Sequence, residues 1–130
     1  MLYAIFCYND ETAIQAWTPE QDASCMERLI AVQQPWAEQG RLGPVARLDF
    51  TSTATTLRKG KGEPVVIDGP FAETKEQLLG FYVLDVASLD EAIAAARELA
   101  AANPDTGSYE IRPIRTFRPG ATLPEPETTP

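Results

Sequence analysis

Residues 80–104 read GFYVLDVASLDEAIAAARELAAANP and predict a strand followed by a helix. The stretch 80–86 is short and apolar, which is typical of a buried strand. Residues 88–91 (SLDE) form a capping box, in which a serine hydroxyl and a glutamate satisfy the free N–H groups of a helix N-terminus. Apolar positions then recur three or four residues apart, at Leu89, Ile93, Ala96 and Ala100. Asn103-Pro104 ends this helix.

The N-terminal part of the chain repeats this order. Residues 2–8 (LYAIFCY) predict a strand, and 18–21 (TPEQ) form a second capping box with proline at the first helical position. Apolar residues on one helical face follow, at Met26, Leu29, Ile30, Trp36 and Ala37. Pro35 kinks this helix or starts it anew, because proline lacks an N–H and clashes with the preceding turn. Gly40 ends it.

The middle and the end of the chain supply the remaining elements. Residues 41–50 predict a strand, 53–58 and 64–67 a hairpin, 73–79 a helical turn and 108–117 a last strand. The order strand-helix-strand, hairpin, strand-helix-strand predicts an α+β fold, the ferredoxin-like split βαβ arrangement with an inserted β-hairpin. Residues 1–117 form this one domain. Residues 118–130 are rich in proline without apolar periodicity, and we expect a disordered tail.

Two strands lack a polar face. Residues 2–8 and 80–86 are apolar at nearly every position, which is typical of strands that are covered on both sides. The two long helices cover one side of the sheet. We therefore expect a second copy of the chain on the other side, which makes the protein a homodimer.

Composition excludes several classes of function. The net charge is −8 and no basic face is visible, so we expect no nucleic-acid partner. The apolar N-terminal run is too short to span a membrane and lacks the basic flank of a signal peptide, so we expect a cytoplasmic protein without a membrane partner. The chain has no histidine, which removes histidine bases and histidine metal ligands. Cys7 and Cys25 predict buried, reduced thiols, and we expect neither metal nor cofactor.

The run Asp68-Gly-Pro-Phe-Ala-Glu-Thr-Lys-Glu76, followed by Gly-Phe-Tyr at 80–82, resembles the signature of the DGPF branch of the YCII-related family. Thr-Ala-Thr-Thr-Leu-Arg at 53–58 and Glu-Ile-Arg-Pro at 110–113 are weaker matches, and the likeness covers residues 1–117. This resemblance implies membership of the dimeric α+β barrel superfamily, whose members pack two sheets face to face around a cavity. A His-Asp pair is a proposed active site in some members. Only the aspartate half exists here, and Asp68 is the nearest candidate by motif.

Six residues are candidates for a site. Asp68 either accepts N–H bonds from the turn that follows it, or faces a cavity as a catalytic carboxylate. The candidates for substrate binding are Phe71, Lys75, Glu76, Tyr82 and Arg112. Each has a structural alternative: a core or interface aromatic for Phe71 and Tyr82, and a solvated ion pair for the charged residues.

Two kinds of function fit these observations. The first is the binding of an unknown small molecule in a cavity between subunits, extending to an enzyme without metal or histidine that uses Asp68. The second is a non-catalytic module that senses a small molecule, associated with sigma-factor-type transcription control, as the family resemblance suggests. Whether the protein is an enzyme is left open by the residues.

Overall fold

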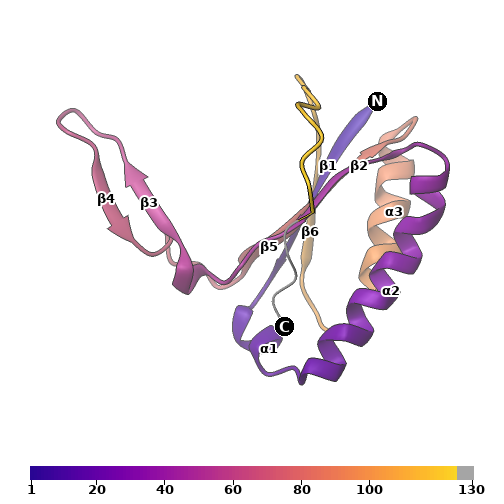
Figure 1. Cartoon of the computed structure of the whole chain (residues 1–130), viewed down its shortest axis with the longest axis horizontal. Coiled ribbons are helices and arrows are strands. Elements are labelled where there is room, and N and C mark those ends of the chain that lie inside the picture. Colours follow the sequence, from indigo (N-terminus) through magenta and orange to yellow (C-terminus); the bar gives the residue numbers. More distant parts are fainter. Residues whose placement is uncertain (126–130) are drawn as a thin grey trace.

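A computed structural model describes residues 1–125 as a four-stranded sheet with two long helices on one face and a hairpin that projects from it (Figure 1). The sheet consists of β1 (Leu2–Asn9), β2 (Leu42–Arg47), β5 (Gln77–Asp85) and β6 (Ser108–Pro113). The helices are α1 (Glu11–Gln15), α2 (Pro19–Glu38) and α3 (Leu89–Ala102). A short 3-10 turn (Thr51–Thr53) precedes the hairpin strands β3 (Thr55–Arg58) and β4 (Val65–Asp68).

The strand order confirms the predicted topology. The sheet runs β2-β5-β1-β6, and every neighbouring pair is antiparallel. Helix α2 joins β1 to β2 across β5, and α3 joins β5 to β6 across β1. These are two split βαβ units, so the fold is the ferredoxin-like α+β arrangement, with β3 and β4 inserted as a separate two-stranded hairpin.

The core lies between the sheet and the helices. Ile5, Leu84 and Leu99 are almost completely buried there. Helix α3 contributes mainly small side chains, namely Ala92, Ala95, Ala96 and Ala102. Alanines allow a helix to lie close to a sheet, which explains why this helix is so rich in them. The predicted apolar face was partly wrong, because Leu89 lies in the first turn, at the edge of the core, and is half exposed.

Helix α2 begins and ends where the sequence predicts. The Thr18 hydroxyl accepts from the Gln21 N–H at 3.1 Å, and the Gln21 side chain accepts from the Thr18 N–H at 2.8 Å. The helix continues through Pro35, so the alternative of a new helix at that residue is wrong. Gly40 then adopts a positive φ of 70°, which glycine reaches without steric cost, and ends the helix.

Several boundaries differ from the predicted ones; the strand expected at 41–50, for example, ends at Arg47. Helix α1 was not expected; the Asp10 carboxylate caps it by accepting from Thr12 N at 2.9 Å. Residues 77–79 belong to β5 rather than to a helical turn, because β1 continues past a bulge and Asn9 pairs with Gln77. Strand β6 ends at Pro113 instead of residue 117.

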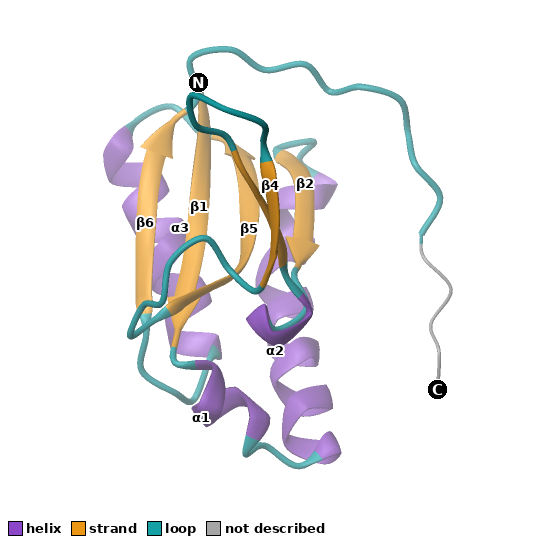
Figure 2. Cartoon of the chain, turned by 90° about the vertical axis from the view of Figure 1, so that its left-hand side faces the viewer, coloured by secondary structure: helices purple, strands orange, loops and turns teal. Residues whose placement is uncertain are grey.

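The other face of the sheet carries no helix (Figure 2). Ala4 and Val83 lie on this face, and the hairpin projects from the same side (Figure 1). The chain after β6 extends away from the sheet (Figure 2), and the end of the predicted tail, residues 126–130, lies outside the described residues. None of the helices within residues 1–125 is long and apolar enough to cross a membrane.

Candidate functional site

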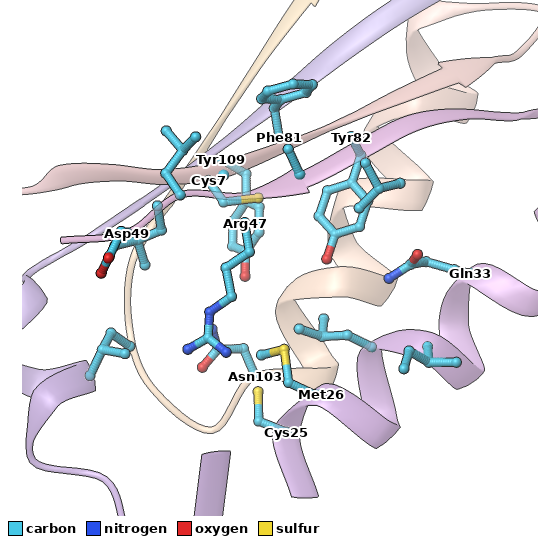
Figure 3. A pocket seen from close by; sticks show the side chains of 18 of the residues that line it. Cys7, Cys25, Met26, Gln33, Arg47, Asp49, Phe81, Tyr82, Asn103 and Tyr109 are labelled. Carbon is cyan, nitrogen blue, oxygen red and sulfur yellow. The ribbon is translucent and has the colours of Figure 1, made fainter. Parts of the chain in front are cut away.

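A cavity of about 450 Å³ lies between α2 and the helix-facing side of the sheet (Figure 3). Its floor is one row of residues across the sheet. In that row Arg47 of β2 pairs with Gly80 of β5, Gly80 pairs with Cys7 of β1, and Cys7 pairs with Tyr109 of β6. Of the two middle positions, Gly80 has no side chain and Cys7 has a short one. The row is therefore hollow at its centre and bounded by larger side chains at its ends.

Gly80 is also required by the approach of two strands. A Cβ atom at this position would collide with the carbonyl oxygen of Ala46 and lie 3.2 Å from Cα of Arg47. Strand β2 can pair with β5 at this point only because residue 80 has no side chain. One glycine thus allows the sheet to form and leaves the cavity floor open.

Helix α2 and the neighbouring loops close the cavity. Helix α2 contributes one face, made of Cys25, Met26, Leu29, Ile30 and Gln33. Further apolar side chains come from outside α2, namely Ile14, Trp17, Leu48, Phe50 and Leu79. Tyr82 points from β5 to the same side as Arg47, whereas the ring of the next residue along the chain, Phe81, lies on the opposite side of the sheet (Figure 3). The lining is therefore mostly apolar.

Arg47 provides the principal polar group of the cavity. Its Nη2 donates to Oδ1 of Asp22 at 2.6 Å, and its Nη1 donates to Oδ2 of the same carboxylate at 3.1 Å. This bidentate pair links β2 to α2, and the hydrogen bond with Arg47 holds the pKa of Asp22 below its usual value. Asp49 also lines the cavity, and its Oδ1 accepts from the N–H of Phe50 at 2.8 Å.

The cysteine thiols and two tyrosine hydroxyls of the lining are neutral at ordinary pH. Burial raises the pKa of the Cys7 thiol to about 12 and that of the Tyr109 hydroxyl to about 12. Burial also raises the pKa of Tyr82 and of Cys25. A thiol with a raised pKa forms little thiolate, the reactive species of cysteine. Both cysteines are free, Cys25 is buried and Cys7 is half-buried, so the site favours binding over nucleophilic chemistry.

Of the predicted site residues, only Tyr82 lines the cavity. Asp68 ends β4 in the projecting hairpin, on the side of the sheet away from α2 (Figure 1), and pairs with Thr55. Within residues 1–125 no N–H group donates to the Asp68 carboxylate. The turn that follows is held instead by the N–H of Gly69, which donates to the Ala54 carbonyl oxygen at 2.7 Å.

The other predicted residues are dispersed. Phe71 is 74% exposed, and its carbonyl oxygen accepts from Nη2 of Arg58 at 2.9 Å. Lys75 is exposed, and Glu76 accepts from the Ser108 hydroxyl at 2.8 Å. Arg112 is paired with Ala4, so it lies on the sheet face without helices, opposite to the cavity. The structure therefore does not bring these residues to Tyr82.

The sequence reasoning missed the residues that shape this cavity: Cys7 as floor, Gly80, Arg47, Asp22 and Tyr109. One signal was present, because Arg47 is a charged residue flanked by apolar residues, Val45-Ala46 and Leu48, within the predicted strand. In the part of the chain that the structure describes, no three histidine, cysteine, aspartate or glutamate side chains converge to hold a metal ion. The apolar walls could hold an organic group.

Fold and site together define a class: a two-layer ferredoxin-like α+β protein with an apolar cavity between its sheet and one helix. A family model described as "YCII-related domain" matches residues 1–118, and the chain belongs to this family. The resemblance seen in the sequence is thereby confirmed at family level. A relative from Rhizobium meliloti (strain 1021), "Uncharacterized protein R00369", is 60% identical over 120 residues, which cover 92% of this chain and 97% of the relative.

Proposed function

We propose that this YCII-related protein binds a small, largely apolar molecule in the cavity between α2 and the sheet. The observation that carries the proposal is the hollow row at Gly80 and Cys7, roofed by the apolar face of α2. Ligand sites in proteins commonly have volumes of about 300–1,000 Å³ and few polar groups on an apolar lining. The location differs from the sequence-based expectation, which placed the ligand between two subunits.

A fluorescence titration tests this proposal. The neutral probe N-phenyl-1-naphthylamine should bind to the wild type and to Cys7→Ala, which leaves the floor open. Cys7→Phe fills the hollow and should weaken binding at least tenfold, while far-UV circular dichroism shows that the variant is folded. If Cys7→Phe fails to fold, Met26→Phe fills the same space from α2. Equal affinity in a folded, filled variant would refute the cavity as the binding site.

We also propose that two copies of the chain pair through the sheet face without helices. On this face Phe6 and Phe81 are only partly buried and their ring centroids lie 6.5 Å apart, and the hairpin exposes Val66 (67%) and Leu57 (64%). A two-stranded hairpin is marginally stable by itself in water, and a contiguous exposed apolar surface usually marks an interface. These observations support the homodimer expected from the sequence.

The mass in solution tests the pairing. Light scattering should give twice the chain mass of 14.2 kDa for the wild type. Val66→Glu in the hairpin should shift the protein toward the monomer, whereas Arg97→Glu, on the exposed side of α3, should leave the mass unchanged. A wild-type monomer at micromolar concentration would contradict the proposal.

Both functional classes considered from the sequence, an enzyme and a non-catalytic sensing module, are compatible with this cavity. The neutral thiols and tyrosines favour a binding or sensing module over an enzyme with a cysteine nucleophile. A catalytic role of Asp68 requires a second site, bordered by the hairpin and a partner subunit. The exposed Asp68 carboxylate supports that alternative, because no N–H group within residues 1–125 engages it.

A further inference from the structure

The guanidinium of Arg47 has donors to spare inside the cavity. It extends from the sheet into the space above α2 (Figure 3), and two of its N–H groups bind Asp22. A guanidinium has five N–H donors, so Nε–H and one N–H on each Nη are left over. Within residues 1–125 the guanidinium makes no other hydrogen bond. The Arg47 side chain is 48% exposed, so water reaches these donors, and a ligand that displaces this water has to supply an acceptor in its place.

The charge of Arg47 is already balanced. Asp22 neutralises it at 2.6 Å, and Asp49 is the one other charged residue that lines the described cavity. A bound carboxylate would thus meet one cation and two anions, in a protein whose net charge is −8. The apolar walls offer such an anion no compensation for its lost hydration. A neutral acceptor gains the unused N–H groups without this repulsion.

We infer that the ligand of this cavity is a neutral, mainly apolar molecule with a carbonyl-type oxygen, which accepts a hydrogen bond from Arg47 while Asp22 holds the guanidinium in place. This inference rests on the proposed function, since it names the class of ligand for the same cavity. Tyr82 stands beside Arg47 and supplies a second group that can donate to an oxygen (Figure 3). The raised pKa values of Cys7 and Tyr109 agree with a site built for an uncharged occupant.

Three ligands of one shape separate the contributions. 2-Acetonaphthone carries a neutral carbonyl, 2-naphthoate a carboxylate, and naphthalene no acceptor. Their dissociation constants are measured at pH 7.5 by displacement of N-phenyl-1-naphthylamine. The ketone should bind at least tenfold more tightly than the carboxylate and several-fold more tightly than naphthalene. A carboxylate that binds as tightly as the ketone would overturn the inference.

Two variants assign the effect to the pair. Arg47→Gln should bring the affinity for the ketone close to that for naphthalene, with naphthalene affinity retained. Asp22→Asn removes the carboxylate that neutralises Arg47, so it should improve the binding of 2-naphthoate at least fivefold. This result would support the inference even if Arg47→Gln does not fold. Arg41→Gln, an exposed arginine before β2, is the matched control. Unchanged preferences in both variants would refute the role of the pair.

The outcomes distinguish the two levels of the proposal. If naphthalene and the ketone bind equally well and Cys7→Phe abolishes both, the cavity binds ligands but the inference about ligand class is wrong. If no ligand and no probe binds to the wild type, the proposed function itself is wrong. If the ketone is preferred and Arg47→Gln removes that preference, both the cavity as binding site and the inferred class of ligand are supported.

Discussion

Replacing Gly80 by alanine tests the feature that shapes both sheet and cavity. The new Cβ would collide with the carbonyl oxygen of Ala46 and crowd Cα of Arg47, which lies 3.2 Å from it. Both obstacles are backbone atoms of a paired strand, so no side-chain rotation relieves them. Strand β2 has to move away from β5, and the hydrogen bond of 2.8 Å from Leu48 N to the Leu79 carbonyl oxygen lies next to the displaced point.

The magnitude follows from two opposing effects. Overpacking costs typically about 1–3 kcal/mol, and a rigid backbone obstacle belongs at the upper end of this range. Loss of glycine flexibility in the unfolded chain gives back about 0.4–1 kcal/mol. We therefore expect a net loss of about 2 kcal/mol in the free energy of unfolding. For a domain of this size that lowers Tm by roughly 6–10 °C.

Urea denaturation and thermal melts followed by circular dichroism measure this loss. Gly60→Ala in the hairpin turn is the matched control, because a Cβ there meets no atom within 4 Å and its φ is not positive. The control should be neutral or gain up to about 1 kcal/mol. If Gly80→Ala is as stable as the control, the close approach of β2 and β5, and with it the register that forms the cavity floor, is wrong.

Two further predictions concern titration and the turn of the hairpin. The Cys7 thiol has a pKa of 9.0 when unfolded and about 12 when folded, so its proton is lost first from the unfolded chain, and the free energy of unfolding should fall as pH rises from 9 toward 12. Urea titrations at pH 8, 9, 10 and 11 should show a shallower decline for Cys7→Ala than for the wild type; equal slopes would refute the buried thiol. Asp68→Asn should change the free energy of unfolding by less than about 0.5 kcal/mol, because no N–H group within residues 1–125 binds that carboxylate. Clear losses of about 1 kcal/mol or more in both Asp68→Asn and Asp68→Ala would instead make Asp68 a turn residue.

The fold was predictable because its signals are local. The two predicted capping boxes place the starts of α2 and α3 by side-chain to backbone bonds within four residues. The box of α2 is complete, whereas at α3 the Ser88 hydroxyl accepts from Glu91 N but the Glu91 carboxylate accepts from Ala87 N instead of Ser88 N. The hairpin followed from a threonine-rich run, a glycine-containing turn and an apolar return strand. Helix α1 was not predicted, because its five residues are too few to show a helical periodicity.

The cavity was not predictable because register creates it. Arg47, Gly80, Cys7 and Tyr109 belong to four strands that are distant in sequence, and only their pairing puts them in one row. A glycine and a cysteine in apolar strands look like ordinary small residues until that row is known. Tyr82 was predicted because it lies close in sequence to the Asp68–Glu76 motif, and its position in the cavity played no part in that prediction.

Strand β5 contributes residues to both proposed binding surfaces, the cavity and the dimer interface. Its residues alternate between the cavity, with Gly80 and Tyr82, and the opposite face, with Phe81 and Val83. A ligand in the cavity and a partner subunit on the open face would therefore contact opposite sides of the same strand. Coupling free energies are reciprocal, so a ligand that tightens dimerisation must itself bind more tightly to the dimer. Ligand affinity measured in Val66→Glu, which is altered far from the cavity, tests this coupling. A lower affinity in this variant would show that β5 transmits it, and an unchanged affinity would show that the two surfaces are independent.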